Sequence, residues 1–153
     1  MKVESWLESI GKTHAVLVEL GLDPDLRLVR LYPGATELYL EPEAGLSYRF
    51  YAKTKVLNAV IVSIVKRVES QPEFKGTLSQ PYGCLTKNAV REVWGNPLNA
   101  KGPSMMPQPI GKTGGWDLYE LTSQGFDNLE LVFQYTSELS VSGVVLRARD
   151  DEA

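Results

Sequence analysis

A regular alternation of residue types near the end of the chain constrains its fold more than any other feature. Every second residue from Leu129 to Tyr135 is apolar or aromatic. Because neighbouring side chains of a strand point to opposite sides of a sheet, this period of two predicts a strand with one buried face. The chain must therefore form a sheet and supply a second layer that covers it.

Other segments share this period or are apolar throughout, and they predict the remaining strands: 36–41, 46–51, 56–65, 116–121 and 139–148. The first two segments flank a Pro-Glu-Ala-Gly turn and predict a hairpin. The segment 56–65 also fits a short helix, but its many valines and isoleucines favour a central strand. Together these segments predict a largely antiparallel sheet of about six strands.

A period near 3.6 predicts two short helices within the first 22 residues and a third helix from Thr86 to Trp94. Thr13 has the chemistry of a cap for the second helix. Residues 99–115 contain four glycines and three prolines and predict a long loop. No internal repeat is evident, because the two Ile-Gly-Lys-Thr segments at 10–13 and 110–113 lack matching surroundings. We expect one α+β domain over residues 1–153, with a frayed acidic tail at 150–152.

Composition excludes several classes of function. The 153 residues include one cysteine, Cys84, and one histidine, His14, so we expect neither a disulfide framework nor a metal site, and no cofactor. The formal net charge of −3 argues against a nucleic acid as partner. No apolar run reaches the roughly 20 residues that span a membrane, and the N-terminus does not resemble a secretory signal. These features predict a cytoplasmic protein with no membrane partner.

No catalytic pattern stands out. The Gly-Lys-Thr at 111–113 lacks the preceding glycine of a phosphate-binding loop, since Met106 occupies that position. Cys84 has no histidine nearby in the sequence and predicts a buried, inert thiol. Asp117 and Glu120 lie on opposite faces of their predicted strand, so they do not form an acid–base pair. We therefore expect a protein that is not an enzyme, with no catalytic, cofactor-binding or metal-binding residue.

The best candidate site is a surface for protein recognition. On the predicted hairpin, one outer face carries charged and aromatic residues: Glu37, Tyr39, Glu41, Arg49 and Tyr51. Tyrosine and arginine are favoured anchors at interfaces, and the carboxylates would attract a basic partner. Asp117 and Tyr119 form a second candidate beside Trp116, which we expect in the core.

Two regions of the sequence resemble a known family. Ser-Ile-Gly-Lys-Thr at 9–13 precedes a helix ending in Glu-Leu-Gly-Leu, and Trp94-Gly95-Asn96-Pro97 is followed by Gly115-Trp116-Asp117-Leu118-Tyr119. This combination is similar to a family of small bacterial proteins, some of which are labelled pyocin or bacteriocin immunity proteins. The resemblance implies a cytosolic protein that binds and neutralises a cognate toxin, such as a nuclease with a basic cleft. It implies no particular functional residue.

Two other classes of function stay open. One is a small structural or assembly module that makes contacts within a larger complex without a toxin partner. The other is a hydrolase that uses Asp117, Glu120 or Asp127.

Overall fold

The computed structural model describes residues 3–66, 68 and 70–149. Helices α1 (Val3–Ser9) and α2 (His14–Glu19) come first, and α3 (Lys87–Trp94) lies midway along the chain. A short 3-10 helix, η1 (Thr122–Gln124), connects two later strands. The three predicted helices are thus confirmed.

Within the described residues, seven strands form one antiparallel sheet in the order β1-β2-β3-β9-β8-β7-β4. Their bounds are β1 (Glu37–Glu43), β2 (Leu46–Tyr51), β3 (Leu57–Ser63), β4 (Asn99–Lys101), β7 (Trp116–Glu120), β8 (Leu129–Tyr135) and β9 (Val141–Ala148). Strands β5 (Ser104–Met105) and β6 (Lys112–Thr113) form a separate hairpin.

The predicted α+β class and the predicted antiparallel sheet are confirmed. The sheet has one strand more than expected, because β4 joins it. Residues 99–115 also hold β5 and β6 and are not a continuous loop. Every residue of β4 is exposed, so this edge strand is held by its backbone pairing with β7. For the same reason its sequence shows no alternation of apolar residues from which a strand could be predicted. The predicted fraying at 150–152 concerns residues outside those described.

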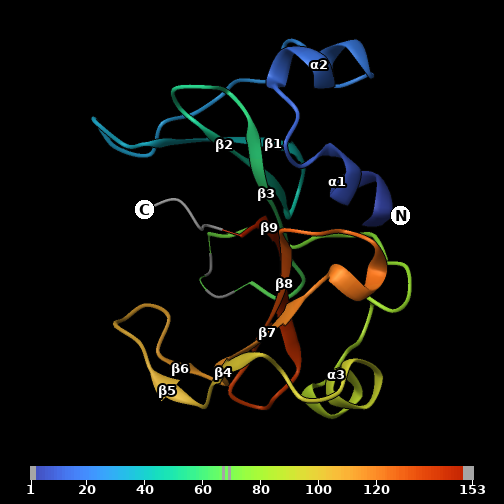
Figure 1. Ribbon diagram of the computed structural model, residues 1–153. Helices are drawn as coiled ribbons and strands as arrows, with labels where there is room; N and C mark the ends of the chain where they lie inside the picture. The colour runs from blue at the N-terminus through green and yellow to red at the C-terminus, as the bar shows by residue number, and fades with distance from the viewer. Residues whose placement is uncertain (1–2, 67, 69, 150–153) are drawn as a thin grey trace.

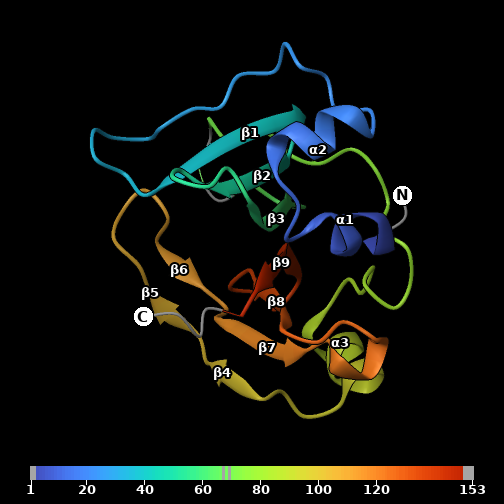
Figure 2. The ribbon, with the colours of Figure 1, turned by 45° about the horizontal axis from the view of Figure 1, so that its top comes forward.

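The helices gather on one side of the sheet. Figure 1 shows α1 and α3 on the same side, whereas the β5–β6 hairpin lies on the other side. We call the helix-covered side the core face and the opposite side the open face. In both ribbon views the segment between α2 and β1 arcs outward past β1, away from α1 (Figures 1 and 2).

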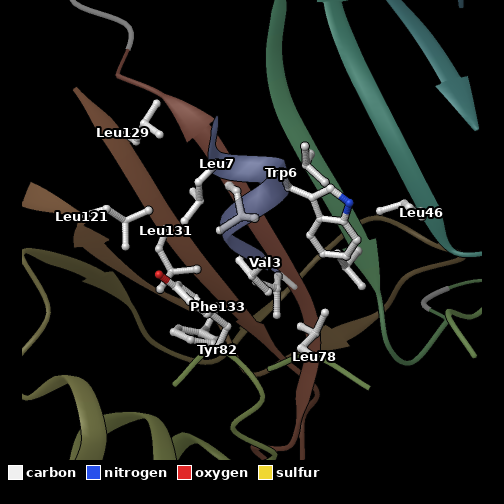
Figure 3. Close-up of a cluster of buried hydrophobic side chains, with 14 of the residues drawn as sticks. Val3, Trp6, Leu7, Leu46, Leu78, Tyr82, Leu121, Leu129, Leu131 and Phe133 are labelled. Atoms are coloured by element: carbon white, nitrogen blue, oxygen red, sulfur yellow. The ribbon is translucent and has the colours of Figure 1, made fainter. Parts of the chain in front are cut away.

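The main core lies between α1 and the middle of the sheet. Val3, Trp6 and Leu7 follow helical spacing and are buried, so α1 presents one apolar stripe to the strands. Figure 3 shows this stripe among side chains of β8, including Leu131 and Phe133. Four aromatic rings also pack together, with Trp94 in contact with the other three, and they are Tyr82, Trp94, Tyr119 and Phe133. Burial of these groups supplies the main stabilisation of the fold.

Six of the seven strands of the sheet form two halves with the same order of elements, and β4 adds to the edge of the second half. In the first half α2 precedes the antiparallel strands β1, β2 and β3, and in the second half α3 precedes β7, β8 and β9. The third strand of one half pairs with the third strand of the other, so β3 and β9 meet at the centre. The strand order is therefore mirrored about this central pair.

The helix caps show the same equivalence in atomic detail. Thr13 Oγ1 accepts a hydrogen bond from the amide of Val16, and Thr86 Oγ1 accepts one from the amide of Ala89. Each threonine also forms an antiparallel bridge with the residue just before the third strand of its half, Thr13 with Val56 and Thr86 with Ser140. Each threonine thereby links the first turn of a helix to the beginning of the third strand of its half.

The strand pairs repeat a bulge as well. Asn58 and Ser142 are each the unpaired residue where the register shifts, and both are buried. The order of elements, the caps and the bulges therefore recur in the structure, although the sequence itself shows no repeat. Sequence reasoning could not detect this repeat, because equivalent positions share burial and backbone geometry but not residue identity.

Candidate functional site

The open face carries one row of side chains that crosses six strands. Cross-strand pairing places Tyr39 opposite Arg49, Arg49 opposite Ala59, and Ala59 opposite Arg147. The row continues from Arg147 to Glu130 on β8 and then to Glu120 on β7. Directly opposed side chains lie close enough to interact, so antiparallel register alone assembles this site from residues far apart in the sequence.

The row borders a hollow of about 660 Å³, which we call the charged hollow. Its charged lining residues are Glu37, Arg49, Glu120, Glu130, Arg147 and Arg149. Tyr51 and Leu98 also line it, with 39% and 61% of their surfaces exposed. The hollow therefore combines a charged floor with apolar groups at its border.

The first cluster of the floor joins β1, β2 and β3. Arg49 Nε donates to Asn58 Oδ1 at 2.7 Å and lies 3.2 Å from Glu37 Oε2. Asn58 Nδ2 reaches the same Glu37 oxygen at 3.5 Å. The buried amide of Asn58 thus fixes both charged side chains, because it is itself held at the bulge of β3.

The second cluster joins β7, β8 and β9. Arg147 Nε donates to Glu130 Oε1 at 3.1 Å, and Arg149 pairs with Glu120. Arg149 Nε also lies 3.9 Å from Glu130 Oε2. These side chains are partly exposed, so each pair contributes about 0–1 kcal/mol to stability. Their main effect is to hold the arginines in defined positions above the sheet.

The structure brings four of the five predicted hairpin residues to the open face. Glu37, Tyr39 and Arg49 are half-buried there and Tyr51 is exposed, whereas Glu41 is exposed at the register irregularity between Leu40 and Glu43. The expected acidic character is not found on the floor, however, because Glu37 is paired with Arg49 and the lining of the hollow contains as many arginines as glutamates. The floor therefore presents alternating charges and not a negative field.

The second predicted surface is wrong. Asp117 and Tyr119 lie on the core face, where Asp117 has no exposed surface and Tyr119 is buried. They lie on the core face because they pair with Phe133 and Leu131 of β8, which are both fully buried. Trp116, expected in the core, instead lies half-buried on the open face opposite Gln134. The predicted separation of Asp117 and Glu120 on opposite faces is confirmed.

Asp117 connects α3 to the sheet. Arg91 donates to both carboxylate oxygens of Asp117, from Nε at 2.9 Å and from Nη2 at 2.7 Å. The hydroxyl of Tyr135 donates to the same carboxylate at 2.7 Å. Burial raises the pKa of Asp117, but the bonds from Arg91 and Tyr135 outweigh it, so the pKa lies below its ordinary value. The carboxylate is therefore a structural anion in this fold.

The neighbouring tyrosines are buried with this anion. Tyr119 donates its hydroxyl to the Gly95 carbonyl at 2.9 Å, at the end of α3. Burial, with Asp117 nearby, raises the pKa of Tyr119 to about 12. Burial and the bond to Asp117 also raise the pKa of Tyr135. Both phenols are therefore neutral at physiological pH.

The predicted surface missed four of the six charged residues of the hollow, and they are Glu120, Glu130, Arg147 and Arg149. Glu130 alternates with the apolar residues of β8, and Arg147 alternates with those of β9, whereas Arg149 follows the end of that strand. The signal was therefore present for Glu130 and Arg147, since both occupy outward positions of predicted strands. Only the pairing of β3 with β9 brings them beside Arg49, and the pattern of residues does not give that pairing.

The described residues contain no group of three or more histidine, cysteine or acidic side chains arranged to hold a metal ion. Cys84 is buried as expected, with its thiol 3.3 Å from the Pro81 carbonyl. Burial raises the pKa of this thiol, which keeps it protonated and unreactive. Across the described ranges, no helix has the length and apolarity that a membrane crossing requires.

No protein-family model matches the sequence, and no curated protein matches it. Among solved structures, the chain is similar to the crystal structure of a DUF4309 family protein (YjgB) from Bacillus subtilis subsp. subtilis. The TM-score is 0.46 at 14% sequence identity, and the superposition covers 89% of this chain and 78% of that chain.

Proposed function

We propose that this protein is a non-enzymatic binding protein that recognises another protein with the open face of its sheet. The observation that carries the proposal is the charged hollow, a concavity of about 660 Å³ bordered by the exposed Tyr51 and Leu98. Arginine and tyrosine are the residue types that most often anchor interfaces.

The ion pairs of the floor support this role. Arg49 and Arg147 are each held by an acidic neighbour, so a partner would meet side chains that are already ordered. Prior ordering reduces the entropy lost on association. The alternating charges also favour specificity, because a partner must present the complementary arrangement to avoid like-charge contacts.

The partner class that we propose is a bacterial toxin, with this chain acting as its cytoplasmic immunity protein. The resemblance of residues 9–22 and 94–119 to immunity proteins supports this class. An enzymatic toxin, such as a nuclease, would be neutralised when its active cleft is covered by the open face. Because the positive and negative charges of the floor balance, long-range electrostatic attraction would contribute less to capture of the toxin than it would with an acidic surface.

Co-expression with the protein encoded by the neighbouring gene tests the proposal. We expect the two proteins to co-purify and the neighbour to be toxic when expressed alone. A stable complex with a neighbour that is not toxic would favour the assembly module instead. The absence of a complex at micromolar concentrations of both proteins would contradict a toxin partner encoded there.

A further inference from the structure

A second cavity lies at one end of the open face. It encloses about 550 Å³, and we call it the anchor pocket. Its walls include Arg30, Ala35 and Thr36 from the segment before β1, and Tyr51, Ala52 and Lys53 from the end of β2 and its turn. Tyr51 lines both the anchor pocket and the charged hollow, so a partner on the open face can reach both.

Hydrogen bonds hold the two walls in place. Val29 and Tyr39 exchange backbone bonds of 2.7 and 2.8 Å, which attach the segment before β1 to the edge of the sheet. The amide of Ala52 donates to the Thr36 carbonyl at 2.8 Å and joins the two walls directly. Arg30 donates from NH1 to the Ala35 carbonyl. The pocket is therefore formed before any ligand arrives.

The interior of the pocket is suited to an apolar group. The small side chains of Ala35 and Ala52 leave the space open, and the ring of Tyr51 forms part of the wall. In the same segment, Leu31 and Tyr32 expose 65% and 63% of their surfaces. Large apolar side chains exposed together near a cavity are typical of protein interfaces.

The charge at the rim differs from that of the charged hollow. Arg30 and Lys53 are exposed, and within the described part of the chain neither forms an ion pair. None of the described residues that line the pocket is acidic. By contrast, each arginine of the charged hollow has a carboxylate partner. Two unpaired cations beside an apolar cavity complement a ligand that carries a carboxylate next to an apolar group.

We propose that the anchor pocket receives an aromatic or branched apolar side chain of the protein partner, next to a carboxylate that pairs with Arg30 and Lys53. This inference rests on the proposed function and adds the chemistry of the contacting segment. It also changes the partner that the sequence predicted, because the partner's segment at the anchor pocket would be acidic and not basic.

Short peptides test the pocket without knowledge of the partner. The probes are N-acetyl-Asp-Trp-Asp amide and N-acetyl-Lys-Trp-Lys amide, each titrated into the full-length protein and followed by amide chemical shifts. We expect the acidic peptide to shift signals of Ala35, Thr36 and Ala52 at millimolar concentration and to bind about fivefold more tightly than the basic one. Lys53→Glu should reverse that order. Equal affinities, shifts elsewhere, or no shifts would overturn the proposal.

A second pair of variants separates this inference from the proposed function. Ala35→Trp fills the pocket and should abolish peptide binding, whereas Arg147→Ala, in the charged hollow, should leave it unchanged. The dispersion of the amide spectrum of Ala35→Trp verifies its fold, and Ala52→Trp replaces it if that fold is lost. If a toxin complex requires Arg147 but tolerates the filled pocket, the pocket proposal fails and the proposed function survives. If the peptides bind as expected but no protein complex forms, the proposed function fails alone.

Discussion

Thr13 and Thr86 occupy the same position in the two halves of the sheet. Each caps a helix through its hydroxyl and bridges the residue before the third strand of its half. The residue after each cap contacts an aromatic ring of the second strand of its half. The ring centroids of His14 and Phe50 are 5.7 Å apart, and Lys87 Nζ lies 5.8 Å from the ring centroid of Tyr135. Repetition of one unit therefore builds an open face wide enough to hold both the charged hollow and the anchor pocket.

This equivalence predicts matched effects of substitution at the two caps. Thr13→Ala and Thr86→Ala each remove one cap hydrogen bond and should each lower the free energy of unfolding by about 1 kcal/mol. Urea denaturation measures both. The exposed Thr122→Ala is the control and should have little effect. A large loss at only one cap would contradict the equivalence of the two halves.

The two partners of the Arg91–Asp117 ion pair should differ in how much stability is lost when each is replaced. Arg91→Ala leaves a fully buried carboxylate with only the Tyr135 hydroxyl, and it should destabilise the fold by about 3 kcal/mol. Asp117→Asn removes the charge itself and should cost less, because the Arg91 side chain is 39% exposed and can be solvated. Thermal or urea unfolding of the two variants shows which substitution costs more stability. The opposite order would show that the carboxylate is not held chiefly by Arg91.

The lowered pKa of Asp117 predicts how stability depends on pH. The folded state binds the proton less readily than the unfolded chain, whose aspartate pKa is about 3.9, so the carboxylate stabilises the fold at neutral pH. That contribution should disappear as the pH falls below about 4 and through the lower folded pKa. Urea denaturation between neutral pH and about pH 3 should show a smaller loss for Asp117→Asn than for the natural chain. Equal losses would contradict this role.

Gly45 should tolerate no side chain. Its φ is +77°, and an added Cβ would lie 2.0 Å from the backbone nitrogen of Phe74. Gly125 also has a positive φ, of +90°, but its surroundings are open. Gly125→Ala should cost about 1 kcal/mol from backbone strain alone. Gly45→Ala should cost clearly more in urea denaturation, and equal costs would mean that the Phe74 backbone moves aside freely.

Much of the fold could be predicted from residue patterns, because alternation and capping act over a few neighbours. Leu38 and Leu40 identified the core side of β1, and Thr13 and Thr86 marked helix starts. The pairing of β3 with β9 could not be predicted, since any apolar strand could occupy the centre. Asp117 was misplaced because its pairing with β8 puts it on the core face, where Arg91, 26 residues away in the sequence, pairs with its charge.

The proposed function requires that the open face binds the protein partner. The direct measurement is the affinity of the neighbouring gene product for Tyr51→Ala and Arg147→Ala, by isothermal titration calorimetry. Lys12→Ala is the control, since Lys12 is an exposed cation outside the charged hollow and the anchor pocket. We predict losses of about 2 kcal/mol, or about thirtyfold in Kd, for each open-face variant and almost none for the control. Full affinity of both open-face variants, in a complex that does form, would contradict the claim.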